Sequence, residues 1–190
     1  MISQIIIKAV YKVIETIEEI GLDYVIFGGL ALQVWKRLRT TLDVDIMVII
    51  KKGKPGVLID TILKKGLKLD KEKPKVNLGE ITLVRFIYPD EESLLDVRVD
   101  IAIASGGFPE KVVRNRVKLN VFGRDMWFVR CEDLILLKML SNRPIDIADA
   151  KELLHLNKEI INMQYLRKQA LELKIGVRLR DIENDHYSTA

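Results

Sequence analysis

Residues 37–48 read RLRTTLDVDIMV, and this stretch decides the fold because two aspartates stand one residue apart inside an apolar run. Side chains alternate between the two faces of a β-strand, so Asp43 and Asp45 are expected on one face and Val44 and Ile46 on the other. Two carboxylates about 5–7 Å apart on one face repel each other. Mg²⁺ is commonly held by one or two carboxylates together with substrate phosphates. The pair therefore indicates either a metal site or a solvated pair at a sheet edge.

Two neighbouring features favour the metal site. The run DVRVDIAIA (96–104) again places aspartates, Asp96 and Asp100, in an apolar strand, where a buried charge is costly without a partner. If this strand lies beside the first, three carboxylates converge into a site able to hold two divalent ions. Upstream, Gly28 and Gly29 stand between an expected strand and an expected helix. Glycines there let the backbone approach a ligand closely, and a helix N-terminus offers free N–H groups to a phosphate.

Composition sets wider limits. The chain has 190 residues with 48% hydrophobic content, enough for one domain or one domain with a small appendage. Its net charge of +4 is compatible with a nucleotide or nucleic-acid partner without requiring one. A single cysteine, Cys131, excludes a disulfide within the chain and predicts a reducing, cytoplasmic compartment, and we expect this residue to serve packing. No apolar run reaches the ~18 residues of a membrane span.

The order of expected elements indicates an α+β fold, with a mixed β-sheet flanked by helices and followed by a helical C-terminal cap. Hydrophobic periodicity predicts helices at 4–20, 30–38 and 57–66, strands at 24–27, 42–50, 81–88 and 94–104, and a hairpin at 117–129. Polar stretches at 51–56, 68–80 and 89–93 are expected to be turns or loops. We expect a core at 1–130, a helical subdomain at 131–177 with Asn162 as a helix N-cap, and a polar tail at 178–190.

The string GGLALQVWKRLRTTLDVDIMV (28–48) resembles the signature of the DNA polymerase β-type nucleotidyltransferase superfamily. That signature has a glycine pair after a strand, a short helix, and then Asp-apolar-Asp on the next strand. Thirteen residues separate Gly29 from Asp43 (43 − 29 − 1), which suits it. The pattern Arg39-x-Thr41-x-Asp43-x-Asp45 is similar to the abortive-infection and toxin-type branch of the superfamily.

That branch also has a lysine in a helix followed by Arg-x-x-Asp-x-x-Asp, and CEDLILLKMLSNRPIDIADAKELL (131–154) resembles this segment. The matching positions are Lys138, Arg143, Asp146 and Asp149. Members of the family it resembles often have a glycine near Lys36, where this chain reads VWKRLR (34–39), and this departure concerns the local turn rather than the chemistry. The resemblance covers roughly residues 20–155.

The resemblance implies a nucleotidyltransferase-type sheet with a defined set of site residues. Asp43, Asp45 and Asp100 would hold Mg²⁺ or Mn²⁺ and act in catalysis, with Lys138 as a positive charge near the phosphates. A nucleoside triphosphate (NTP) would dock at the glycine pair and the helix after it. The nucleotide-binding positions implied are Gly28, Gly29, Arg39, Thr41, Arg143 and Asp146. In two alternatives that stay open, Lys138 only extends its stem along the protein surface, and Asp146 and Asp149 only favour the helix dipole.

The function implied is Mg²⁺-dependent transfer of a nucleoside monophosphate from an NTP to a hydroxyl acceptor. The acceptor is expected to be RNA such as tRNA, a protein side chain or a small molecule, in an enzyme of a toxin or defence system. The alternative is a non-catalytic module with the same fold, acting as a partner in a two-component toxin–antitoxin pair. Intact Asp43, Asp45 and Asp100 favour the enzyme.

Overall fold

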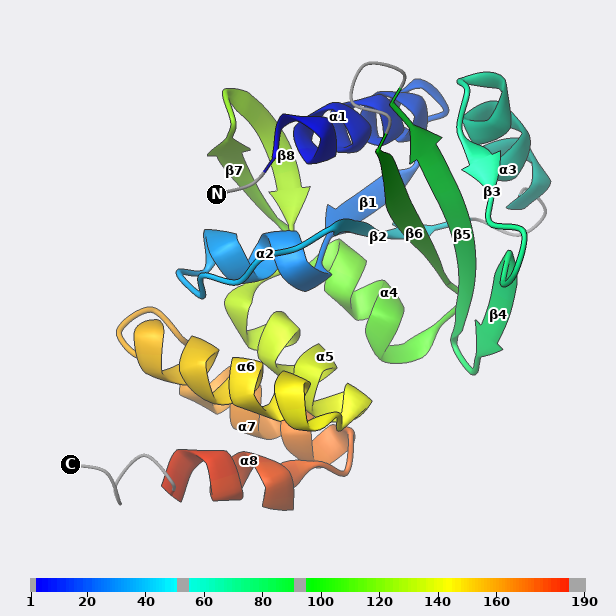
Figure 1. The fold of residues 1–190 in the computed structure, drawn as a ribbon. Helices are drawn as coiled ribbons and strands as arrows, with labels where there is room; N and C mark the ends of the chain where they lie inside the picture. Colours follow the sequence, from blue (N-terminus) through cyan, green and yellow to red (C-terminus); the bar gives the residue numbers. More distant parts are fainter. Residues whose placement is uncertain (1–2, 51–54, 91–94, 185–190) are drawn as a thin grey trace. The chain divides into compact units, whose positions relative to one another are not determined.

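The computed structural model describes residues 3–50, 55–90 and 95–184 (Figure 1). It contains two compact units. Met1–Leu30 and Thr40–Val129 form the first, here called the sheet unit, and Ala31–Arg39 and Arg130–Ala190 form the second, the helical unit. No helix in the described ranges is both long and apolar enough to span a bilayer. Residues 51–54 and 91–93, which make up most of the two turns expected at 51–56 and 89–93, lie outside the described residues.

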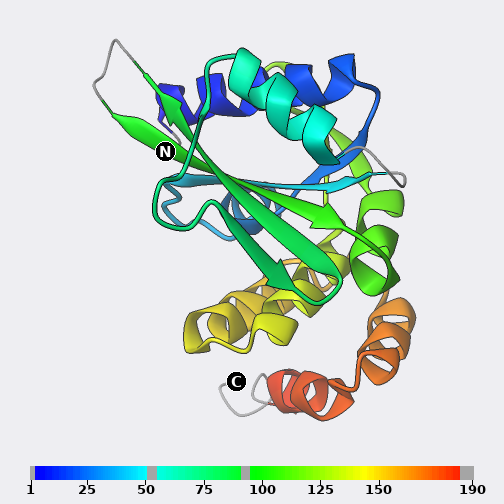
Figure 2. The ribbon, with the colours of Figure 1, turned by 90° about the vertical axis from the view of Figure 1, so that its right-hand side faces the viewer.

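The sheet unit is a mixed sheet with helices on both faces (Figures 1 and 2). The strand order is β3-β5-β6-β2-β1-β8-β7, and β4 pairs with β5 off this path. β2 runs parallel to β6 and antiparallel to β1, so the sheet is mixed as expected. Its strands are β1 (Asp23–Ile26), β2 (Asp43–Ile49), β3 (Lys68–Leu69), β4 (Lys75–Leu78), β5 (Ile81–Pro89), β6 (Asp96–Ala104), β7 (Val117–Val121) and β8 (Arg124–Phe128).

Helices cover both faces of the sheet. α1 (Gln4–Glu19) and α3 (Pro55–Lys64) lie over one face, and α4 (Gly107–Arg114) packs against β1 and β2 on the other (Figure 2). Both faces of β2 are therefore covered, and Val44, Ile46 and Met47 are fully buried. Burying both faces explains why this strand reads as a nearly continuous apolar run. Asp43 and Asp45 are the only charged residues of this otherwise apolar strand, and they mark the position of the candidate site.

The prediction of a loop at 68–80 is wrong, because β3 and β4 form within this polar stretch. β4 pairs antiparallel with β5, from Lys75 opposite Val84 to Leu78 opposite Ile81. A strand at a sheet edge is held by backbone hydrogen bonds to one neighbour, so it can form without apolar alternation. The hairpin expected at 117–129 is confirmed, with β7 and β8 joined at Phe122 and Gly123, both at positive φ.

The helical unit holds α5 (Cys131–Ser141), α6 (Pro144–Leu156), α7 (Met163–Glu172) and α8 (Gly176–Asn184). The Oδ1 atom of Asn162 accepts a hydrogen bond from the Tyr165 backbone N–H at 2.9 Å, which confirms the expected N-cap of α7. Helix α8 occupies part of the range expected to be a polar tail. Leu179 and Ile182 are buried, so two apolar side chains one turn apart anchor an otherwise polar helix.

The segment 31–39 belongs to the helical unit and ends helix α2 (Gly28–Val34) in a Schellman motif. The Arg37 N–H donates to the Leu32 carbonyl at 2.8 Å, and the Lys36 N–H donates to the Gln33 carbonyl at 3.2 Å. Lys36 has φ +67°, the left-handed conformation that this motif requires of its first residue past the cap. Glycine is usual at such a position because it lacks a Cβ.

Replacing Lys36 by glycine should therefore stabilise the protein by about 0.5–1 kcal/mol, because relief of the left-handed strain exceeds the entropy that glycine adds to the unfolded chain. Equilibrium urea unfolding measures the change. Lys168→Gly is the matched control, since Lys168 is exposed inside helix α7 and the same substitution there should cost about 1 kcal/mol. Loss of stability in both variants would contradict the assignment of strain to Lys36.

Candidate functional site

The glycine turn is built against the aspartate strand. β1 ends at Ile26, and the next residue, Phe27, donates its N–H to the Asp45 carbonyl at 3.0 Å. Gly28 has φ +63°, and a Cβ on it would fall 2.0 Å from Asp45 Oδ2 and 2.6 Å from Asp45 Cγ. A Cβ on Gly29 would fall 2.3 Å from Thr41 Oγ1. The glycine pair is therefore required by the space that Asp45 and Thr41 occupy, a reason separate from the phosphate contact expected of it.

Three carboxylates share one face of the sheet. β2 and β6 are parallel neighbours, with Asp45 opposite Asp100 and Asp43 opposite Arg98. Opposite residues on adjacent strands project to the same face, so Asp43, Asp45 and Asp100 lie on one side. Thr41 supports the start of this strand, since its hydroxyl donates to the Asp43 carbonyl at 3.2 Å. The two strands expected to lie side by side are neighbours in the structure.

Two arginines that the sequence pattern did not single out lie among these carboxylates. Arg98 donates from Nη2 to Asp43 Oδ2, and its Nε lies 3.8 Å from Asp100 Oδ2. Arg85 on β5 stands opposite Asp100, with its Nε 3.4 Å from Asp100 Oδ1. The available signal was the spacing, because Arg98 is two residues before Asp100 and so shares its face.

Within the described part of the chain, no group of three or more His, Cys, Asp and Glu side chains is arranged to hold a metal ion.

Asp100 is the most buried of the three carboxylates, at 7% exposure. Burial raises the pKa of its carboxyl, and the charge of Asp43 adds to the rise, while Arg98 and Arg85 act in the opposite direction. Asp100 Oδ1 is buried and accepts no well-aligned hydrogen bond. Arg85 Nε lies 3.4 Å from this oxygen as an ion pair rather than an aligned hydrogen bond, so the oxygen can also accept from a further cation or donor.

A second set of predicted residues meets inside the helical unit. Lys138 Nζ on α5 donates to Asp146 Oδ1 at 2.7 Å and to Asp149 Oδ2 at 3.1 Å. Asp146 also accepts from Arg143, and Asp149 accepts from Arg39 Nη1 at 2.6 Å. Both aspartates are fully buried and together pair with four cationic side chains, because Arg37 Nε also lies 3.4 Å from Asp149 Oδ1, so they do more than favour a helix dipole.

Asp146 illustrates the electrostatics of this set. Burial tends to raise the pKa of its carboxyl, but hydrogen bonds from Arg143, Lys138 and Ser141 outweigh it and lower the pKa to about 2. Asp146 is therefore ionised at neutral pH, as its partners require. Cys131 behaves as the expected packing residue, because it is buried and burial raises the pKa of its thiol to about 12.

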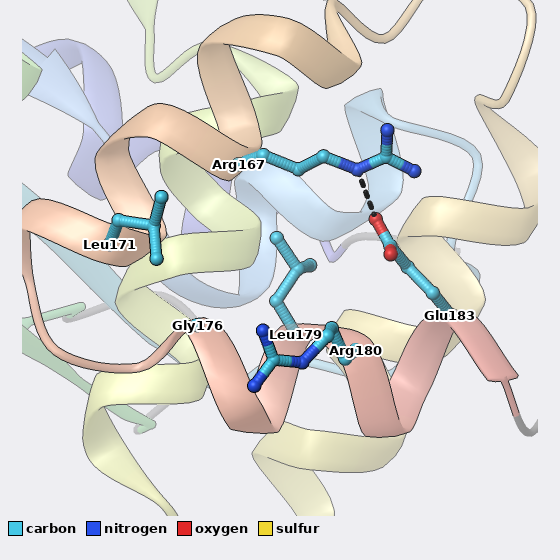
Figure 3. Close-up of a pocket in the computed structure, with 6 residues that line it drawn as sticks. All are labelled: Arg167, Leu171, Gly176, Leu179, Arg180 and Glu183. Atoms are coloured by element: carbon cyan, nitrogen blue, oxygen red, sulfur yellow. Dashed lines mark hydrogen bonds and ion pairs between the residues drawn. The ribbon is translucent and has the colours of Figure 1, made fainter.

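A separate hollow of about 290 Å³ lies between α7 and α8. Figure 3 shows Arg167 and Glu183 facing each other across it, joined by a hydrogen bond from Arg167 Nε to Glu183 Oε1 of 3.1 Å. The remaining lining residues are Leu171, Gly176, Leu179 and Arg180. None of them belongs to the predicted site, so this hollow takes no part in the proposal below.

Comparison with solved structures shows the fold. An antigenic nucleotidyltransferase-like protein from Paracoccidioides brasiliensis is 17% identical, with 94% of each chain covered and a TM-score of 0.51. JHP933 from Helicobacter pylori is 14% identical over 99% of this chain and 97% of that one, with a TM-score of 0.51. The antibiotic-resistance factor ANT(2'')-Ia is 16% identical over 94% and 95%, with a TM-score of 0.54.

A search of curated proteins found no significant match to the sequence. The family described as "Nucleotidyl transferase of unknown function (DUF2204)" matches residues 6–184, nearly the whole chain. The expectation of a nucleotidyltransferase is thereby confirmed, whereas the DNA polymerase β-type superfamily and its abortive-infection and toxin-type branch stay predictions. The chain belongs to this family of nucleotidyltransferases.

Proposed function

We propose that this nucleotidyltransferase is dependent on Mg²⁺ or Mn²⁺ and transfers a nucleoside monophosphate from an NTP to a hydroxyl acceptor. The observation that carries the proposal is the placement of Asp100 directly opposite Asp45 on adjacent strands, beside a glycine that leaves room for the Asp45 carboxylate. Oxygen ligands of this kind suit a hard divalent cation. The buried Oδ1 of Asp100, which accepts no aligned hydrogen bond and has only the ion pair with Arg85, suits the same ligand.

The proposed work of the chain's own residues is positioning and charge balance. Asp43, Asp45 and Asp100 would hold the divalent ions, which when bound stabilise the entering and leaving oxygens of an in-line displacement at the α-phosphate. Gly28 and Gly29 leave the space that Asp45 and Thr41 occupy, and their backbone would meet the triphosphate. The acceptor hydroxyl loses its proton as it attacks, the bond from the α-phosphorus to the bridging oxygen breaks, and pyrophosphate leaves.

Arg39, Lys138 and Arg143 have a proposed positioning role rather than direct contact with phosphate. Each is held by a buried carboxylate of α6, and Lys138 shares both Asp146 and Asp149. Arg39 precedes Asp43 by four residues, in the approach to the metal-binding strand. Thr41 acts within the same approach through its hydrogen bond to the Asp43 carbonyl.

RNA such as tRNA, a protein side chain and a small molecule remain the candidate acceptors. Aminoglycosides are included among the small molecules on the sequence resemblance, and the similarly folded ANT(2'')-Ia is named as an antibiotic-resistance factor. A toxin or defence role with an antitoxin partner, or a partner role without catalysis, is implied by the sequence resemblance alone. The first experiment is therefore to identify which class of acceptor receives the nucleotide.

The test uses each of the four NTPs labelled at the α-phosphate, with Mg²⁺ or Mn²⁺, and three acceptor pools: total RNA, cell protein and an aminoglycoside mixture. We expect label to move to one pool and to require the metal. The same NTP labelled at the γ-phosphate is the control, because a nucleotidyltransferase releases that label as pyrophosphate. Transfer of the γ-label to an acceptor, or no transfer to any pool together with no metal-dependent NTP binding, would contradict the proposal.

Gly28→Ala should reduce nucleotidyl transfer by about 10²-fold or more, because the new Cβ would displace the Asp45 carboxylate from its place. Initial rates and thermal unfolding are measured together. Gly21→Ala is the matched control: Gly21 also has positive φ, at +68°, but a Cβ on it meets nothing within 4 Å. Equal losses of rate in the two variants would assign the effect to backbone strain and not to Asp45.

A further inference from the structure

Arg98 occupies an unusual place for a strand arginine, since it pairs with two of the three proposed metal-binding carboxylates. Its Nη2 donates to Asp43 and its Nε lies 3.8 Å from Asp100 Oδ2. Arg98 reaches Asp43 because the two residues stand opposite each other in the β2–β6 register. Both aspartates are thus held by a guanidinium attached to the protein itself.

The charges explain why a cation is needed there. Three carboxylates on one face repel each other, and Asp100 is buried where an ionised group is costly without a partner. Arg85 contributes an ion pair to Asp100. Arg98 contacts both Asp100 and Asp43, and so links the two strands electrostatically. Arg98 thus neutralises part of the negative charge of Asp43 and Asp100, as a bound divalent cation would.

The Arg98 side chain is also able to leave. It is 45% exposed, compared with 25% for Arg85, so its guanidinium can move into water without opening the core. A long arginine stem permits such movement while the backbone of β6 stays paired. By contrast, the backbones of Asp43 and Asp100 are held in the β2–β6 ladder, opposite Arg98 and Asp45 respectively.

We propose that Arg98 is a built-in competitor of the divalent cation: it holds Asp43 and Asp100 in the metal-free protein, and metal binding displaces it. This inference rests on the proposed metal-dependent function. Removal of the Arg98 charge should therefore strengthen metal binding, because the ion no longer competes for Asp43 and no longer meets a nearby positive charge. One unit charge at this range changes affinity by about tenfold.

The test measures Mn²⁺ binding by electron paramagnetic resonance, with the metal alone and without nucleotide. Arg98→Met, which keeps the stem and removes the charge, should bind Mn²⁺ about tenfold more tightly than the wild type. Arg98→Gln is the second neutral variant, because its amide can still donate to Asp43 and supports folding if methionine does not. Arg114→Met is the matched control: Arg114 is exposed on α4 and pairs only with Glu110 among the described ion pairs.

Thermal unfolding gives a readout independent of catalysis. Arg98→Met should unfold at a lower temperature than the wild type without metal, and the difference should disappear at saturating Mn²⁺, because the ion then balances the carboxylates. Asp45→Asn should abolish Mn²⁺ binding in either background. If Arg98 had only a structural role, Arg98→Met would unfold at a lower temperature than the wild type at every Mn²⁺ concentration.

The outcomes separate the two proposals. Tighter binding in the neutral Arg98 variants, with no change in Arg114→Met, supports displacement. Unchanged or weaker binding in those variants, while the wild type binds and Asp45→Asn does not, overturns the role of Arg98 and leaves the metal site standing. Absence of Mn²⁺ binding in the wild type and in both neutral variants overturns the metal site, and the inference with it.

Discussion

Asp45→Asn should lower the rate of nucleotidyl transfer by at least ~10²–10³-fold, the loss typical of removing one electrostatic stabiliser from an active site. Asparagine has nearly the same shape as aspartate, so the change removes charge with little change in packing. Asp45 lies in the centre of the sheet, opposite Asp100 and against Gly28, so an ion shared with Asp100 would meet its carboxylate directly. The measurement is the initial rate of α-label transfer at saturating metal, with thermal unfolding to establish that the variant is folded.

Asp96→Asn is the matched control for this experiment. Asp96 lies on β6, four residues before Asp100 and on the same face, but it is exposed at the end of the strand opposite Pro89. Its replacement should leave the rate within about twofold of the wild type, since an exposed charge at that range is largely screened. If Asp45→Asn retained the wild-type rate, or if Asp96→Asn lost as much, the proposed ligand set would be wrong.

Asp149→Asn should destabilise the protein by about 3–5 kcal/mol, the cost of breaking a buried ion pair and leaving its partners uncompensated. The Asp149 side chain is fully buried, and its carboxylate meets Arg39 at 2.6 Å, Lys138 at 3.1 Å and Arg37 at 3.4 Å. Asparagine keeps the shape but leaves these three cations without their shared charge. The corresponding drop in melting temperature is roughly 10 °C for a protein of this size.

Glu152→Gln is the control for Asp149, on the same helix and with a shared partner. Glu152 accepts from Arg37 Nη1 at 2.9 Å, but its side chain is 49% exposed. An ion pair in water contributes only about 0–1 kcal/mol, so this variant should unfold close to the wild type. Similar losses in the two variants would mean that burial does not set the strength of these pairs.

The sequence was sufficient to predict the parts of the molecule that follow a strict period. Strand alternation placed Asp43 and Asp45 on one face. The apolar run around Asp100 singled out that residue, because a charge buried in a strand is costly unless a partner or ligand balances it. The hairpin at 117–129 and the N-cap at Asn162 were predicted correctly because local residue preferences determine such features.

Other features depend on pairing between distant segments, and no local pattern predicts them. Strand alternation puts Arg98 on the face of Asp100, but only the register between strands sets Arg98 opposite Asp43 and Arg85 opposite Asp100. Strands β3 and β4 have polar sequences and exist only because β5 offers a free edge. The partnership of Arg39 with Asp149 joins residues 110 positions apart, and only the three-dimensional structure reveals it.

That last partnership has a consequence for how the protein is made. Segment Ala31–Arg39 belongs to the helical unit, yet the other residues of that unit begin at Arg130. At ribosomal speeds of about 5–20 residues per second, Arg39 emerges roughly 5–20 s before Asp149 has been synthesised. The strands can pair during this interval. Arg37 and Arg39 have no ion pair with Asp149 until Asp149 has been synthesised. The helical unit is consequently completed after the sheet unit, and a gene truncated before Arg130 would leave segment Ala31–Arg39 permanently without its partners.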